Sequence, residues 1–233
     1  MNWKSFNIIT LLFALAVNAQ QDYSHNVVRK GNQVYLTGFK PMSQKGNTCS
    51  FYSTSMILAY YGKYVSPDKL KRKGKSYNPF SGRRKSSNFM EQRLKNFGFT
   101  YIIIRHNGDE LFRAIVKYAI DNGIPIRWEC NMRFSPVKRE RSRSAHARIL
   151  TGYVENNGKI TNIFYTDSWG ERYINRIMSC QNAIKMTNLY GPIFPQKNNQ
   201  KLISDFNALI DLYKKTKYVS NPQIAEEDDE IIE

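Results

Sequence analysis

The stretch Ser43-Gln44-Lys45-Gly46-Asn47-Thr48-Cys49-Ser50-Phe51-Tyr52 decides the fold, because a polar loop here delivers a cysteine to the first turn of a helix that we expect to run to about Gly62. The positive end of a helix favours a thiolate, which is the nucleophilic form of cysteine. The amide of Gln44 and the backbone N–H of Cys49 can form an oxyanion hole beside the sulfur. The alternative is a buried structural cysteine, since free cysteine is among the most buried residue types.

A second stretch, His146-Ala147-Arg148-Ile149-Leu150-Thr151-Gly152-Tyr153, has the composition of a β-strand. The turn Glu155-Asn156-Asn157-Gly158 follows it, and an Asn-Gly pair between two strand-like runs predicts a β-hairpin. The second strand opens into Thr166-Asp167-Ser168-Trp169-Gly170. The hairpin places His146 across from Asp167, so that Asp167 can hold one ring nitrogen while the other faces Cys49.

His146 is the natural candidate for a general base, because the chain has only three histidines. His25 lies near the expected start of the mature protein, and His106 lies beside an expected turn. The alternative for a lone histidine is a solvated or hydrogen-bonded structural residue.

These residues resemble the papain-like cysteine peptidases, and the single-domain spacing is most similar to the bacteriocin-processing-peptidase-like branch. The resemblance rests on a glutamine before a cysteine that opens a helix, a His-Ala strand that leads to Gly-Tyr, and a Ser-Trp-Gly turn. It covers roughly residues 40 to 175. It implies a papain-like α+β fold with N-terminal helices packed on a mostly antiparallel sheet.

The resemblance also implies roles for the catalytic residues. Cys49 would be the nucleophile, His146 the general base and then the general acid, Asp167 the orienting residue and Gln44 the oxyanion donor. Trp169 would shield the His–Asp pair from water and line the substrate site. The sequence departs from the usual pattern of the papain-like peptidases at two points. Gln44 lies only five residues before Cys49, which is slightly tighter than usual, and Asp167 stands where papain itself has asparagine.

Hydrophobic periodicity and turn residues predict the other elements. In chain order we expect a helix begun by Ser66-Pro67, a basic loop 69–85, a helix 89–98, a strand 99–104, a helix 108–123, a strand 124–130, an irregular segment 131–145, a strand 173–178, and helices 179–188 and 202–213. Helices followed by mostly antiparallel strands indicate an α+β fold.

The N-terminal segment has the marks of a secretory signal peptide over residues 1–19: Lys4, an apolar run from Ile8 to Val17, and Ala19 at the expected cut. The alternative is an uncleaved anchor, although the apolar run is short for a bilayer. We therefore expect export to the periplasm or the extracellular space without a membrane anchor. Residues 20–218 suffice for one domain, and residues 219–233 read as an acidic, disordered tail.

Three cysteines form an odd set for an exported protein. Cys130 and Cys180 could form a disulfide that leaves Cys49 free, or they could be two separate buried thiols. No Cys/His cluster has the spacing of metal ligands, so neither a metal nor another cofactor is predicted.

Charge is the next informative feature, since the formal net charge is +16. Part of it lies in the loop 69–85, and a second group flanks His146: Lys138, Arg139, Arg141, Arg143 and Arg148. We expect this second group to rim the cleft, with Arg143 and Arg148 binding acidic peptide substrates. The alternative is a solvated surface. Nothing indicates a specific nucleic-acid partner.

Three functions are compatible with these patterns. The first is an exported cysteine peptidase that hydrolyses peptide bonds through a Cys-His-Asp triad and a thioester acyl-enzyme. The second is a papain-like amidase of cell-wall peptides or an acyl transferase. The third is a non-catalytic basic binding module on the same fold. The sequence does not determine the oligomeric state.

Overall fold

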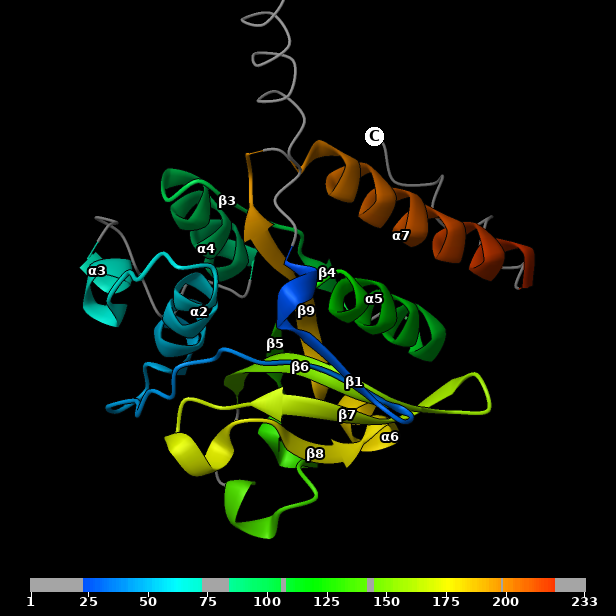
Figure 1. Cartoon of the computed structure of the whole chain (residues 1–233), viewed down its shortest axis with the longest axis horizontal. Helices are drawn as coiled ribbons and strands as arrows, with labels where there is room; N and C mark the ends of the chain where they lie inside the picture. Colours follow the sequence, from blue (N-terminus) through cyan, green and yellow to red (C-terminus); the bar gives the residue numbers. More distant parts are fainter. Residues whose placement is uncertain (1–22, 73–83, 106–107, 142–144, 198, 221–233) are drawn as a thin grey trace, which may run out of the picture.

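The computed structural model describes residues 23–72, 84–105, 108–141, 145–197 and 199–220. Its α-helices are α2 (Cys49–Tyr60), α3 (Pro67–Arg72), α4 (Arg84–Asn96), α5 (Asp109–Asp121), α6 (Cys180–Met186) and α7 (Gln200–Ser220). Its strands are β1 (Val27–Lys30), β2 (Gln33–Leu36), β3 (Phe99–Tyr101), β4 (Ile104–Arg105), β5 (Ile126–Cys130), β6 (His146–Asn156), β7 (Lys159–Thr166), β8 (Arg176–Ser179) and β9 (Thr187–Pro195). Figure 1 shows α2, α3 and α4 grouped on one side of the molecule and α5 and α7 on the other, with most of the sheet between and below them.

The long strand β6 is the centre of an antiparallel sheet. The strand order is β1-β2-β6-β5-β9-β3, while β7 pairs with β6 and β8, and β4 pairs with β9. Two strands share one edge of β6: β5 pairs with its first half and β2 with its second half. The strand β7 occupies the other edge and brings Thr166 opposite Ile149.

Gly152 allows β2 to lie against β6. A Cβ atom at this position would come within 2.6 Å of both the Tyr35 Cβ and the Val34 carbonyl oxygen. Real Cβ atoms do not approach other atoms this closely, so the glycine in the Gly-Tyr pair is required by packing.

Helix α2 is a core helix after its first turn. Met56, Ile57 and Leu58 are completely buried, and each such side chain contributes roughly 1.5–3 kcal/mol of burial free energy. Two buried hydroxyls on the same helix are hydrogen-bonded, as buried polar groups must be: Ser55 Oγ donates to the Val65 carbonyl at 2.6 Å, and Ser53 Oγ to the Ala147 carbonyl at 2.7 Å. The second bond ties α2 to β6.

The expected papain-like α+β architecture is confirmed, including the helix that begins at Cys49 and the hairpin of β6 and β7. The basic loop expected over 69–85 is wrong at both ends, because α3 continues to Arg72 and α4 begins at Arg84. Residues 73–83 lie outside the described ranges. The hairpin of β1 and β2 and the whole of β9 were not anticipated.

The expected signal peptide over residues 1–19 lies outside the described residues. Helix α7 runs to Ser220 and so includes the first two residues of the expected tail, while residues 221–233 also lie outside the described ranges. Within the described part of the chain, no helix combines the length and apolar composition that a membrane crossing requires.

Candidate functional site

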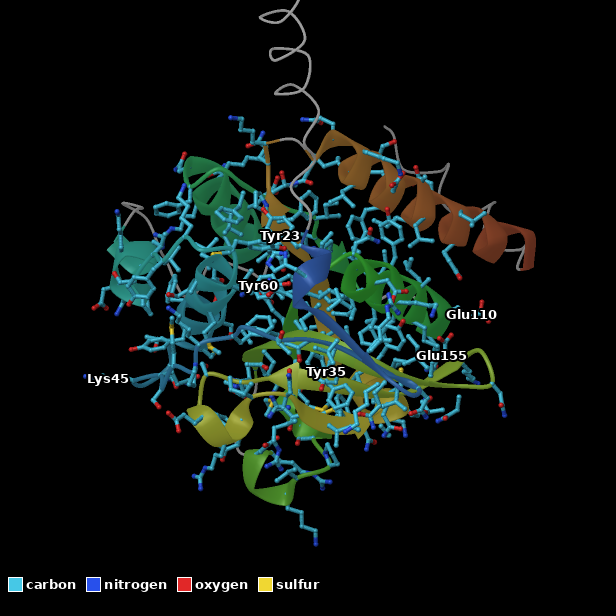
Figure 2. The ribbon with its side chains drawn as sticks, in the orientation of Figure 1. Tyr23, Tyr35, Lys45, Tyr60, Glu110 and Glu155 are labelled. Atoms are coloured by element: carbon cyan, nitrogen blue, oxygen red, sulfur yellow. The ribbon has the colours of Figure 1, made fainter. Side chains whose placement is uncertain are left out.

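The structure brings the side chains of Cys49, His146 and Asp167 together, from three different elements. Cys49 is the first residue of α2, His146 is the first residue of β6, and Asp167 directly follows β7. The His146 Nε2 atom lies 2.8 Å from Asp167 Oδ1. The Cys49 thiol lies close enough to the His146 ring for each to shift the pKa of the other, and Nδ1 is the ring nitrogen that the Asp167 contact leaves available to the sulfur. In Figure 2, Lys45 marks the loop that leads into this end of α2.

The register of the sheet explains this meeting. Cys130, the last residue of β5, pairs with His146, and Thr166, the last residue of β7, pairs with Ile149. The ends of β5 and β7 therefore flank the beginning of β6. The Ser53–Ala147 hydrogen bond holds the first turns of α2 against the same point.

The thiol and the imidazole shift each other's pKa in opposite directions. Burial raises the pKa of Cys49. The opposing effects are larger together and bring the pKa below its ordinary value: they come from His146, from the backbone of Ala147 and from the charge of Arg127. Burial lowers the pKa of His146, but the hydrogen bonds to Asp167 and Cys49 bring that pKa above its ordinary value. Both directions favour a thiolate–imidazolium pair.

All three cysteines are free thiols, so no disulfide joins Cys130 to Cys180. Burial raises the pKa of Cys130 well above its ordinary value and raises the pKa of Cys180 to about 11. Cys49 is thus the only cysteine whose pKa is lowered. Across the described ranges, no group of His, Cys, Asp and Glu side chains could hold a metal ion.

Trp169 packs over the His146 ring. The ring centroids lie 4.7 Å apart with an interplanar angle of 22°, and Tyr173 makes an edge-type contact with the indole at a centroid distance of 5.5 Å. The indole is itself partly buried against the core. Its position is compatible with the expected shielding of the His–Asp pair.

Gln44 is fixed beside Ser168, the neighbour of Asp167. Its backbone N–H donates to the Ser168 carbonyl at 2.7 Å, and its side-chain Oε1 accepts from Ser168 Oγ at 2.6 Å. Its Nε2 donates one hydrogen to the Gly46 carbonyl at 2.9 Å. The amide has a second hydrogen, which is the one that can serve an oxyanion.

Arg148 does not rim a cleft, so this expectation is wrong. Its side chain is 0% exposed, and its Nε donates to Asp167 Oδ2 at 2.8 Å. The reason is strand alternation: residues 146 and 148 face the same side of β6, toward Asp167. The other expected substrate-binding arginine, Arg143, lies outside the described residues.

Sequence reasoning missed two buried charged residues near the site. Arg127 Nη2 donates to Ser50 Oγ at 2.7 Å, next to Cys49, and its Nη1 donates to Glu129 at 2.6 Å. Glu140 accepts from Arg148 at 2.9 Å. A signal existed for the first, since Arg127 and Glu129 are two positions apart on a strand and share a face. Glu140 lies in an irregular segment that has no such periodicity.

Comparison with known proteins gives a family and a set of similar structures. A family model described as the Peptidase_C39 like family matches residues 36–196, whereas no curated protein matches the chain. Similar crystal structures include a protein described as a C39-like peptidase from Bacillus anthracis, with 16% identity, a TM-score of 0.48, and coverage of 71% of this chain and 99% of the other.

Two further structures are similar to the same extent. One is a double glycine motif protease from an AMS/PCAT transporter in complex with its leader peptide, with 14% identity, a TM-score of 0.46, and coverage of 72% of this chain and 97% of the other. The other is the peptidase domain of Streptococcus ComA, with 15% identity, a TM-score of 0.47, and coverage of 68% and 100%.

Proposed function

This chain belongs to the Peptidase_C39 like family, and from that premise we propose that it is a cysteine peptidase that uses Cys49, His146 and Asp167 as a triad. The observation that carries the proposal is the meeting of the Cys49 side chain at the start of α2 with His146 at the start of β6, whose Nε2 lies 2.8 Å from the buried carboxylate of Asp167. The lowered pKa of Cys49 beside the raised pKa of His146 supports it.

In the proposed reaction the Cys49 thiolate attacks the carbonyl carbon of a peptide bond. The backbone N–H of Cys49 and the second amide hydrogen of Gln44 stabilise the oxyanion. The C–N bond then breaks, and His146 gives its proton to the leaving amine, which leaves a thioester on Cys49. His146 next takes a proton from water, the hydroxide attacks the thioester, and the carboxylic acid is released with the thiol regenerated.

Asp167 and Trp169 support His146 in this reaction. The carboxylate fixes Nε2, so Nδ1 stays directed at the sulfur, and it stabilises the imidazolium that carries the proton. The stacked indole excludes water from the His146–Asp167 hydrogen bond. A hydrogen bond in a drier environment is electrostatically stronger.

The experiment that tests the proposal compares the wild-type chain with Cys49→Ala on labelled casein and on purified peptidoglycan. We expect the wild type to cleave casein and the variant to lose about 10⁴-fold or more in kcat. Cleavage of peptidoglycan stems alone would indicate a cell-wall amidase instead. No cleavage, together with no labelling of Cys49 by a thiol-reactive peptide electrophile, would indicate a binding module.

We also propose a preference for acidic peptides. Arg133, Lys138 and Arg141 are exposed on the segment between β5 and β6, and this segment is held beside Asp167 through Glu140 and Arg148. Exposed charges attract acidic ligands less as salt rises. Raising salt from about 50 to 200 mM should therefore increase KM for an acidic peptide more than for a neutral one of the same length. Equal changes would show that these cations are only a solvated surface.

Export is part of the proposal. The composition of residues 1–19 supports cleavage after Ala19. Intact-mass measurement of the protein from the fractions of a bacterial host should find a mature chain that begins at Gln20 outside the cytoplasm. A full-length chain in the membrane fraction would favour an uncleaved anchor.

A further inference from the structure

A buried guanidinium lies behind the His146–Asp167 pair, and the proposed mechanism does not use it. Arg148 Nε donates to Asp167 Oδ2 at 2.8 Å, and its Nη2 donates to Glu140 Oε2 at 2.9 Å. Asp167 and Arg148 are 0% exposed and Glu140 only 6%. Both oxygens of Asp167 are therefore occupied, Oδ1 by His146 and Oδ2 by Arg148.

A charged side chain at position 148 is costly for the fold. Its ladder partner Trp128 is completely buried, and the Arg148 side chain itself has no exposure to solvent. Removal of an ion from water is costly, and well-packed apolar residues are often at least as stable as a buried ion pair. Residues that break a local rule in this way are expected mainly at functional sites.

Glu140 balances the charge of Arg148 without competing for Asp167. Its Oε2 also accepts from Ser135 Oγ at 2.7 Å, and Arg141 Nε binds the Ser135 carbonyl at 2.8 Å. The segment from Ser135 to Arg141 thus folds around the guanidinium and holds it against the end of β7. The Tyr165 ring, 4.7 Å from the guanidinium carbon, packs against its face.

We propose that Arg148, neutralised by Glu140, is a positioning residue that locks the Asp167 carboxylate in the orientation in which Oδ1 meets Nε2 of His146. This inference rests on the proposed peptidase function. An unrestrained carboxylate at the end of a strand can rotate about its terminal torsion, because that torsion is broad. The hydrogen bond from Nε removes this freedom, and the imidazole is held in turn.

Several charged or titratable groups face this network. Glu140, Asp167, Cys130 and Tyr165 surround Arg148, while His146 faces Asp167 and Cys49. Removal of Arg148 alone would change the charge felt by all of them. A test of positioning must therefore remove the hydrogen bond while it keeps the net charge constant.

The double variant Arg148→Met/Glu140→Gln meets this requirement, because it removes one positive and one negative charge together. We expect kcat on labelled casein to fall by about 100-fold with KM little changed, as for a misplaced catalytic group. We also expect the alkaline limb of kcat/KM to move to lower pH, because the imidazolium that protonates the leaving amine loses its ordered acceptor. A purely structural role would lower the melting temperature and leave this limb in place.

Two further variants complete the design. Lys117→Met/Glu155→Gln removes another cation–glutamate pair at the other end of β6, where Lys117 Nζ and Glu155 Oε2 are 2.6 Å apart, and it should leave kcat and the pH profile of kcat/KM unchanged. Arg148→Lys keeps the charge but reaches one carboxylate at a time, so its kcat should lie between the wild type and the double variant. It also provides the test if the double variant does not fold.

The outcomes separate this inference from the proposed function. An active wild type with a bell-shaped pH profile of kcat/KM, and Arg148 variants with the same kcat and the same limbs, would overturn the positioning role alone. A change confined to KM would also overturn it, since it would indicate substrate binding. An inactive wild type whose Cys49 is unreactive would instead overturn the triad.

Discussion

The two ends of strand β6 carry similar ion pairs in different surroundings. At the His146 end, the pair of Arg148 and Glu140 is almost inaccessible, with side chains 0% and 6% exposed. At the other end, the pair of Lys117 and Glu155 is 44% and 29% exposed. Figure 2 shows Glu155 far from the loop that carries Lys45, on the opposite side of the molecule.

This difference separates charges that a fold tolerates from charges that a site requires. A partly exposed pair costs little and contributes little, typically below about 1 kcal/mol. A buried pair is expensive to assemble, and its members cannot be removed singly without leaving an uncompensated charge. The buried pair also touches Asp167, whereas Lys117 of the exposed pair contacts the Tyr153 hydroxyl and Asp121.

The largest difference between the two ion pairs is expected in the free energy of unfolding after single substitutions. Arg148→Met leaves Glu140 and the Oδ2 atom of Asp167 without their buried cation, so we expect a loss of about 3–5 kcal/mol in the free energy of unfolding. Urea denaturation monitored by circular dichroism measures it. A loss no larger than that of Lys117→Met would show that the two ends are energetically equivalent.

A smaller effect should distinguish the carboxylates at the two ends. Asp167→Asn keeps an acceptor for Nε2 but removes the negative charge that helps to raise the pKa of His146. Imidazolium is then lost at lower pH, so the alkaline limb of kcat/KM should move down, with less than about a 100-fold loss at the optimum. Glu155→Gln is the matched control, and its pH profile should overlay that of the wild type. An unmoved limb in Asp167→Asn would remove Asp167 from the account.

The smallest effect is expected when the partly exposed pair of Lys117 and Glu155 is removed. Lys117→Met/Glu155→Gln should change the free energy of unfolding by less than about 1 kcal/mol, because both side chains exchange one partner for water. The change should also shrink further at high salt. A loss of several kcal/mol would mean that partial exposure does not weaken this pair.

The parts of the fold that can be predicted are those marked by a few neighbouring residues in the sequence, such as a turn or the start of a helix. The polar loop before Cys49 marks the start of α2, and Asn157-Gly158 marks the turn of the long hairpin, where both residues adopt a positive φ. Gly31, which also has a positive φ, lies in the turn between β1 and β2, but the strands on either side have only four residues each and give a weak signal. The strand β9 contains Pro192 and Pro195, which argue against a central strand when only the sequence is read.

The parts that were not predictable depend on contacts across the chain. The hairpin geometry brings His146 and Asp167 together, so their meeting follows from one local turn. The burial of Arg148 follows only once Glu140 folds back from an irregular segment to neutralise it. Net charge alone therefore predicts a cleft-rim role for Arg148, whereas its place two residues after His146 on the same strand puts it on the face of His146.

The central claim is that the sulfur of Cys49 and the ring of His146 act as one titrating pair. The most direct measurement is the rate of Cys49 alkylation by iodoacetamide against pH, in the wild type and in His146→Ala. The account predicts rapid alkylation of Cys49 well below its ordinary pKa in the wild type, no reaction of Cys130 or Cys180 in the folded protein, and loss of the low-pH reactivity in the variant. Identical profiles in the two proteins, with the reactivity of an ordinary thiol, would contradict it.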